Sequence, residues 1–410
     1  MGKKFILGLF AILFAALAVR SAVAADDVVR LVYMDPFSGL GAAASEEAAR
    51  HFQFLAKKIN AAGGVAGKKL EVVTMDNENN PEKSLILLKT AIDDGVQFIT
   101  QGQSSSVAYS LSDAVAKNNK RNPEHPVLFM DWSNADPGLT GEKCNFWYFR
   151  FDANLEMKMR ALSVYMASQP QVKKVYVINQ DYSMGQSVER AATAMLPKAG
   201  SGIEIVGTDR IPLGKVKDFS PYIAKIQASG ADSVVTGAWG QDLMLMLKAA
   251  SESGLKATFY TYYGNTRGLP TALGKSAKGT VLINEWHSNV GEAAVDKMAS
   301  EFKADSKIDF TQWRIALTME MFAKAMNQAK STAPLKVALA LEGLRYDTPM
   351  GEANMRADNH QVLEPLFISV LTDGVKNDME SSGLGFKTLR KIEAKDTSIP
   401  SVCQMERPRL

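Results

Sequence analysis

The segment INAAGGVAGKKLEVVTMDNENNPEKS, residues 59–84, contains the end of one helix, a whole strand and the start of the next helix. A glycine pair at 63–64 ends the helical pattern, because such pairs favour turns. KLEVVTMD, residues 69–76, has the composition of a strand. Asn80 then supplies an N-cap, and Pro81 suits the first helical position. This order predicts a strand inserted between helices rather than a hairpin.

The same alternation runs through the chain in two series. Near-continuous apolar strands between amphipathic helices indicate parallel sheets covered on both faces. Two such series predict an α/β protein with two Rossmann-like lobes, each built on a parallel central sheet. The predicted strands are residues 28–34, 69–76, 96–100 and 126–130 in the first series and 172–179, 203–211, 232–237 and 258–263 in the second, followed by a late strand at 365–371.

The N-terminus has the pattern of a secretory signal peptide. Lys3 and Lys4 precede an apolar run, residues 5–19, and Ala22 and Ala24 are small residues at the positions that a signal peptidase reads. The run is shorter than the roughly 20 residues of a membrane span. We therefore expect residues 1–24 to be removed, and, with no cysteine near the cleavage point, we do not expect a lipoprotein.

Charge argues against nucleic acid as a partner. Of the 47 basic residues, three leave with the signal segment, so 44 remain against 44 acidic residues. A neutral chain lacks the basic face that phosphate binding requires.

The two cysteines, Cys144 and Cys403, both lie in the mature part. In an oxidising compartment the simplest expectation for such a pair is a disulfide. The alternative is two unrelated buried thiols.

Enzyme signatures are missing from the sequence. GLPTALGKS, residues 268–276, resembles a phosphate-binding loop, but five residues separate its glycines where the motif has four. No dinucleotide fingerprint follows a strand, and the four histidines show no ligand-like spacing. We therefore predict no catalytic residues, no cofactor and no metal, and we do not expect an enzyme.

Polar and aromatic residues gather where the predicted strands end. Ligands of open parallel sheets bind at this edge. The segment at 102–106 also opens a helix, so its free N–H groups and hydroxyls can hold a carboxylate. Helix capping and core packing are the alternative roles for each residue. The candidate ligand-binding residues are Phe37, Ser104, Ser105, Ser106, Trp132, Ser133, Asn134, Tyr182, Trp239, Asp242, Tyr262 and Tyr263.

Several of these stretches together resemble the periplasmic binding proteins of the branched-chain amino acid ABC transporter type. The resemblance covers the whole mature chain and is carried by PFSG (36–39), the 59–84 block, GQSSS (102–106), VYVINQDYSMGQS (175–187), WGQDLMLMLKAASESGL (239–255) and TPMGEANMRADNHQ (348–361). It implies a type I periplasmic binding fold, a clamp that closes by hinge motion. The implied crossovers lie near 150, 281 and 346. Lobe 1 is then 25–150 plus 282–345, and lobe 2 is 151–281 plus 346–410.

The resemblance also implies where a ligand is held. Its carboxylate meets residues 104–106 and 132–135, and the second lobe contributes from the loops at Tyr182, Trp239 and 262–264. This sequence departs from the family pattern twice. Ala135 stands where amino-acid binders have a threonine.

The second departure concerns the glutamate that family members place against an α-ammonium. This sequence reads TYYGNTRG there, residues 261–268, without an acid. A buried ammonium without a partner is costly. Asp181 or Asp242 could replace the acid, while Arg150 and Arg267 are possible anion partners or serve the hinge and the surface.

These features favour a flat aromatic carboxylate, such as a benzoate or phenylpropanoid, as the ligand. The resemblance implies a monomeric periplasmic protein that delivers its ligand to an ABC permease and its ATPase. Two alternatives remain for the same clamp: capture of a branched-chain or other amino acid, and a soluble ligand sensor.

Overall fold

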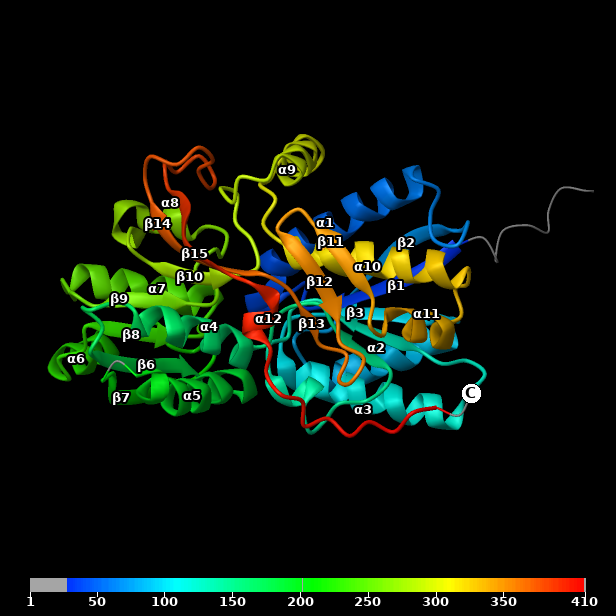
Figure 1. Ribbon diagram of the computed structural model, residues 1–410, viewed down its shortest axis with the longest axis horizontal. Coiled ribbons are helices and arrows are strands. Elements are labelled where there is room, and N and C mark those ends of the chain that lie inside the picture. Colours follow the sequence, from blue (N-terminus) through cyan, green and yellow to red (C-terminus); the bar gives the residue numbers. More distant parts are fainter. Residues whose placement is uncertain (1–27, 201, 409–410) are drawn as a thin grey trace, which may run out of the picture.

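The structure is a computed structural model that describes residues 28–200 and 202–408 (Figure 1). The predicted signal peptide lies outside the described residues. Two sheets lie side by side, one built from the first third of the chain and the other mainly from the middle, and helices cover both faces of each (Figure 1).

The first sheet is parallel throughout and has the strand order β2-β1-β3-β4-β5. Successive side chains of a strand point to opposite faces. In β1 (Val28–Asp35), Leu31 and Tyr33 accordingly pack with α1 (Ala42–Ala61) and α10 (Trp313–Ala329), while Val32 and Met34 pack with α2 (Pro81–Asp93) and α3 (Ser105–Arg121). The strands are β1 (Val28–Asp35), β2 (Lys69–Asp76), β3 (Phe98–Gln101), β4 (Leu128–Asp131) and β5 (Tyr148–Arg150). The helices of this part are α1 (Ala42–Ala61), α2 (Pro81–Asp93) and α3 (Ser105–Arg121), with short helices η1 (Gly39–Gly41) and η2 (Pro137–Thr140).

The second sheet has the order β15-β14-β10-β9-β8-β6-β7. Its strands from β6 to β10 are parallel, whereas β14 runs antiparallel to β10 and β15 antiparallel to β14. The predicted α/β class with parallel central sheets is confirmed, and the antiparallel edge is an addition to it. The strands are β6 (Lys174–Gln180), β7 (Glu204–Ile211), β8 (Ser233–Thr236), β9 (Thr258–Thr261), β10 (Val281–Asn284), β14 (Leu366–Thr372) and β15 (Gly385–Ile392).

The helices of the middle and late chain complete both layers. Those of the second sheet are α4 (Leu155–Ala167), α5 (Ser183–Met195), η3 (Pro197–Ala199), α6 (Ser220–Ala228), α7 (Gly240–Glu252), α8 (Leu269–Leu273), η4 (Gly274–Ala277) and α12 (Ala394–Thr397). α9 (Ala293–Ser306), α10 (Trp313–Ala329) and α11 (Pro334–Leu341) return to the first sheet and share its core.

The helix start inferred at Asn80 has the expected cap. The Asn80 side chain accepts a hydrogen bond from the Lys83 backbone N–H at 3.0 Å, and Pro81 occupies the first helical position. The cap satisfies an N–H that has no partner within the helix.

Three connections join the sheets: between β5 and α4, between β10 and α9, and between the short strand β13 (Val362–Leu363) and β14. The third lies near 364 rather than near 346. The reason is a small antiparallel sheet of β11 (Arg345–Thr348), β12 (Gly351–Met355) and β13, whose Ala353 and Met355 belong to the core of the first sheet. We therefore propose that residues 345–363 belong with lobe 1.

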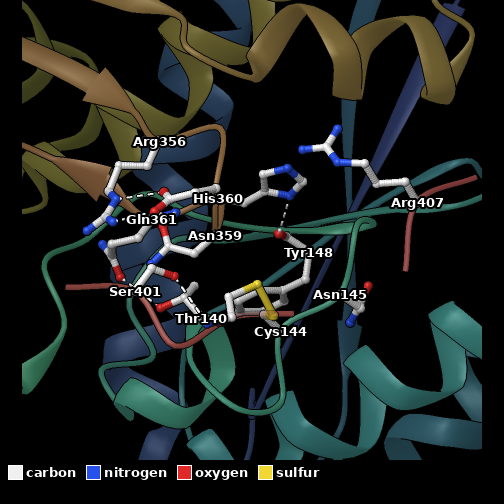
Figure 2. Close-up of a disulfide and its surroundings, with 12 residues drawn as sticks. Thr140, Cys144, Asn145, Tyr148, Arg356, Asn359, His360, Gln361, Ser401 and Arg407 are labelled. Carbon is white, nitrogen blue, oxygen red and sulfur yellow. Dashed lines mark hydrogen bonds and ion pairs between the residues drawn. A yellow bond between two sulfur atoms is a disulfide. The ribbon is translucent and has the colours of Figure 1, made fainter. Parts of the chain in front are cut away.

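The predicted disulfide between Cys144 and Cys403 is confirmed, with the two Cα atoms 5.7 Å apart. It ties the C-terminal segment to the first lobe (Figure 2). The same segment is held by Arg356, which donates to the Ile399 carbonyl, and by an ion pair of Arg407 with Glu342. Across the described residues, no helix combines the length and the apolar character needed to cross a membrane.

Candidate ligand-binding site

A cavity of about 340 Å³ opens between the two sheets, and we call it the ligand cavity. It lies at the carboxyl ends of the parallel strands, as expected for this class of sheet. Its lining comes from both lobes and comprises Gly39, Ala43, Ala44, Glu47, Gly102, Gln103, Ser104, Ser105, Trp132, Ser133, Asn134, Ala135, Tyr182, Met184, Trp239, Gly240, Gln241, Met244, Tyr263, Asn265, Thr266, Arg267, Gln312 and Arg314.

Eight of the twelve candidate residues line this cavity: Ser104, Ser105, Trp132, Ser133, Asn134, Tyr182, Trp239 and Tyr263. The other four, Phe37, Ser106, Asp242 and Tyr262, are not among its lining residues. The Phe37 ring packs edge-on against Tyr33, with ring centres 5.5 Å apart. The Ser106 hydroxyl lies 3.5 Å from that of Ser183 in the facing lobe. Tyr262 is buried in the core of the second sheet.

Asp242, the fourth, has a structural role. Its buried carboxylate accepts hydrogen bonds from the Gln180 side chain at 2.7 Å and from the Gly214 backbone at 2.8 Å. Asp181, the other acid considered as an ammonium partner, is exposed and accepts from Gln186. Neither aspartate lines the ligand cavity.

Asp35, at the end of β1, holds the loop that opens α3. Its carboxylate accepts hydrogen bonds from the backbone N–H groups of Gly102 at 3.1 Å and Gln103 at 2.9 Å, and from the Trp132 indole N–H at 3.1 Å. Burial raises the pKa of Asp35 to about 7, although these hydrogen bonds oppose the shift. Since Asp35 uses the N–H groups before the helix, those of the first turn of α3 remain for a ligand.

Ser104 adopts an unusual backbone conformation at this helix start. Its φ is 81°, in a region that non-glycine residues rarely occupy. Such strain persists where the surrounding structure imposes it, and it recurs at ligand sites. The loop that presents Ser104 and Ser105 to the cavity is therefore fixed in place.

Trp132 forms one wall of the ligand cavity and is also a core residue. Its side chain is only 3% exposed and packs edge-on against Tyr33 and Phe52. A Cβ atom on Gly102 would lie 2.3 Å from the indole, so only glycine fits beside it. These contacts thus fix the orientation of the Trp132 ring in the cavity wall.

The second lobe contributes two rings joined by a hydrogen bond. The Trp239 indole N–H donates to the Tyr182 hydroxyl at 2.9 Å. Tyr182 immediately precedes α5 and Trp239 immediately precedes α7, so two further helix N-termini lie beside the cavity. Burial raises the pKa of Tyr182 well above its usual value, so the hydroxyl stays neutral. The positive ends of helices favour an anionic ligand.

Three charged side chains line the ligand cavity: Glu47, Arg267 and Arg314. Glu47, on α1, accepts hydrogen bonds from Thr311 and, at 3.3 Å, from the Gln312 side chain. Burial raises its pKa, while the two hydrogen bonds and the charge of Arg267 oppose that shift. Sequence reasoning missed both Glu47 and Arg314, because each lies within a helix with no local motif to mark it.

Arg314 joins the cavity to a cluster of buried charges. Its guanidinium donates to the Ser133 hydroxyl at 3.0 Å and to Asp152 at 2.9 Å. Its Nε lies 3.3 Å from Glu285. The Lys158 Nζ also lies 2.9 Å from the Asp152 carboxylate.

The acids of this cluster mark the three connections between the lobes. Asp152 follows β5, Glu285 follows β10, and Glu364 lies between β13 and β14; all three are buried. Burial raises the pKa of Glu364 well above its usual value. All three connecting segments thus contribute an acid to this buried cluster. The positive charges of Arg314 and Lys158 compensate the negative charges of these acids.

Arg150, which sequence reasoning considered as an anion partner, is fully buried at the end of β5, beside the first connection between the lobes. It donates to the Gln361 side chain at 2.7 Å and to the carbonyls of Asn134 and Asp136. Arg267, the other arginine considered, faces the ligand cavity. Within the described residues, no group of three or more His, Cys, Asp or Glu side chains could hold a metal ion.

Comparisons with known proteins agree with this architecture. Residues 28–376 match the model of the family described as periplasmic binding protein. The chain is 33% identical over 361 residues to the Leu/Ile/Val-binding protein homolog 4 of Brucella abortus, covering 86% of each.

Two solved structures are also similar. One is the closed conformation of the leucine-, isoleucine-, valine-, threonine- and alanine-binding protein from Brucella ovis, with TM-score 0.86 and 30% identity, covering 93% of this chain and 99% of that one. Another is a solute-binding protein of an ABC transporter from Rhodopseudomonas palustris in complex with 3,4-dihydroxybenzoic acid, with TM-score 0.78 and 17% identity, covering 90% of this chain and 98% of that one. The chain therefore belongs to the periplasmic binding protein family.

Proposed function

We propose that this protein captures a small aromatic carboxylate in the periplasm and delivers it to the permease and ATPase of an ABC importer. The observation that carries this proposal is the lining of the ligand cavity. One end offers the N-terminus of α3 with Ser104 and Ser105, and the walls offer Trp132, Trp239 and Tyr263.

Each half of such a ligand has a matching surface. The unpaired N–H groups of a helix start bind a carboxylate without a counter-charge. Aromatic walls bind a flat ring, and stacked ring pairs add about 0.5–1.5 kcal/mol beyond the burial of area. The complex of the Rhodopseudomonas palustris protein with 3,4-dihydroxybenzoic acid supports this choice, because the same fold accommodates a benzoate-type acid there.

A second candidate ligand is a branched-chain amino acid. Glu47 is an acid within the lining that could face an α-ammonium. The relatives named as Leu/Ile/Val-binding homologs point the same way. Against it, Glu47 already accepts two hydrogen bonds and lies near the positive charge of Arg267.

A thermal-shift panel separates the two candidates. Benzoate-type acids, phenylpropanoids and branched-chain amino acids are added to ligand-free protein, and the same panel is repeated with Glu47→Gln. The proposal predicts stabilisation by the aromatic acids in both proteins. If leucine alone stabilises the native protein and Glu47→Gln abolishes that effect, the protein is an amino-acid binder.

Ligand capture requires the lobes to close on the cavity, which both of them line. If the protein binds its ligand without converting it, the two lobes should close when ligand is added. X-ray scattering from a monomer would measure this closure as a fall in the radius of gyration. The ligand should also be recovered unchanged after incubation. Conversion of the ligand into a product would show an enzyme instead.

A further inference from the structure

We propose that Arg267 determines specificity in the ligand cavity and selects an aromatic acid that carries a second anionic group. This inference rests on the proposed function, since it concerns the same ligand. It adds a chemical class: a ring with two acidic substituents rather than one.

Arg267 lies after β9 at the boundary between two cavities. It lines the ligand cavity and also a neighbouring cavity of about 300 Å³, which Glu47 and Glu380 line as well. The side chain of Arg267 is 48% exposed. A guanidinium there reaches the ligand cavity while remaining accessible from solvent.

The donors of Arg267 are available. In the described part of the chain its ion-pair partner is Glu380, whose Oε1 lies 3.8 Å from Nε, beyond hydrogen-bond distance. The Glu380 carboxylate is already occupied: it accepts from the Gly268 backbone at 2.8 Å and from the Thr271 hydroxyl at 3.2 Å. A guanidinium presents five N–H donors in a planar fork that matches a carboxylate.

The other charges of the cavity do not compete for such a ligand group. Arg314 is compensated by Asp152 and Glu285. Glu47 accepts hydrogen bonds from Thr311 and Gln312. Arg267 is therefore the cavity cation without an ion-pair partner at hydrogen-bond distance, and it stands in the segment where the amino-acid binders that this chain resembles carry an acid.

Two consequences follow for the ligand. A second carboxylate can pair with Arg267 while the first is held at the start of α3. An α-ammonium would meet a like charge, which disfavours it. Arg267 thus favours a dianionic ring and opposes an amino acid.

Calorimetric titration tests this with three probes: benzoate, isophthalate and terephthalate. We expect one of the two dicarboxylates to bind the native protein about tenfold more tightly than benzoate, as for one partly exposed charge-assisted pair. Arg267→Gln should remove that advantage, because it weakens binding of that dicarboxylate about tenfold more than it weakens binding of benzoate. The matched control is Arg345→Gln on β11, an exposed arginine remote from the cavity lining, which should change neither affinity.

The outcomes separate this inference from the proposed function. If benzoate binds and both dicarboxylates bind no more tightly, or if Arg267→Gln weakens all three alike, the role of Arg267 is refuted while aromatic-acid capture stands. If none of the three acids binds and leucine does, both proposals fall. Unchanged circular dichroism of each variant shows that folding is intact.

Discussion

Replacing Arg314 with methionine should destabilise the protein strongly, because it removes a buried cation from the centre of the hinge. Methionine keeps much of the volume and the apolar stem of arginine. It leaves Glu285 without its 3.3 Å ion-pair partner and Asp152 with Lys158 alone. The Ser133 hydroxyl in the cavity wall also loses its donor.

The magnitude follows from the burial of the cluster. The side chains of Arg314, Asp152 and Glu285 are at most 4% exposed, so water cannot replace the lost partner. Breaking a buried ion pair by removing one member costs about 3–5 kcal/mol. Adding Glu285→Gln to Arg314→Met removes one of the uncompensated acids and should recover about 1 kcal/mol or more.

The loss should also depend on pH in a defined direction. Burial raises the pKa of Glu285 in the folded protein and the charge of Arg314 opposes that rise, so removing Arg314 raises the pKa further. Stability from such groups is present at low pH and is lost as pH rises through the folded pKa. The deficit of Arg314→Met relative to the native protein should therefore be larger near pH 8 than near pH 5.

Urea unfolding followed by tryptophan fluorescence measures these differences. The exposed pair of Arg345 with Glu352, 3.4 Å apart, supplies the control, since Arg345→Gln should cost less than about 1 kcal/mol. If Arg314→Met costs no more than this control, or if its deficit grows as pH falls, the account of the hinge cluster is wrong.

Three further predictions concern the disulfide, the cavity wall and a buried histidine. Cys144→Ser should lower the free energy of unfolding by about 2–5 kcal/mol, and a reductant should affect only the native protein; equal stability with and without the bridge would contradict this. Trp132→Ala should lower the free energy of unfolding by about 3–5 kcal/mol and also weaken ligand binding, because the ring belongs both to the core and to the cavity wall. Urea unfolding and calorimetry measure the two effects, and a variant that changes neither would contradict both roles. Burial lowers the pKa of His51 from 6.5 to about 3, so stability should fall as pH falls from 6.5 towards 3, and an NMR titration showing a charged His51 ring at pH 5 would refute that reading.

The neutral state of His51 follows from its contacts. Its Nδ1–H donates to the Glu47 carbonyl at 2.8 Å, and its Nε2 accepts from the Thr311 backbone N–H at 3.1 Å. A proton on Nε2 would face that donor. Because the unfolded state binds more protons between pH 6.5 and 3, acid favours unfolding in this window.

The sequence predicted the architecture well where local signals decide it. Helix caps such as Asn80 and near-continuous apolar strands mark a parallel α/β chain, and the cysteine pair marked its disulfide. The small sheet at 345–363 was not predicted, because a segment's own pattern does not tell which lobe core receives Ala353 and Met355. The antiparallel edge formed by β14 and β15 was not predicted either, because the pattern of a strand does not show which strand it pairs with or in which direction.

The residues of the candidate site also fall into a group that local sequence signals predicted and a group that they did not. The loops at strand ends carry Ser104, Trp132 and Tyr182, and the geometry of parallel sheets brings such loops together. Arg314 and Glu47 reach the cavity from within α10 and α1, where only the packing of these helices on the first sheet brings them to it. Charged residues that reach the cavity only through the packing of their helices cannot be found by looking at the residues that follow predicted strands.

A calorimetric titration of ligand-free protein with benzoate-type acids and with leucine under the same conditions tests aromatic-acid capture directly. We predict that at least one aromatic carboxylate binds tenfold or more tightly than leucine, a difference of about 1.4 kcal/mol. Tight binding of leucine with no heat from any aromatic acid would contradict it.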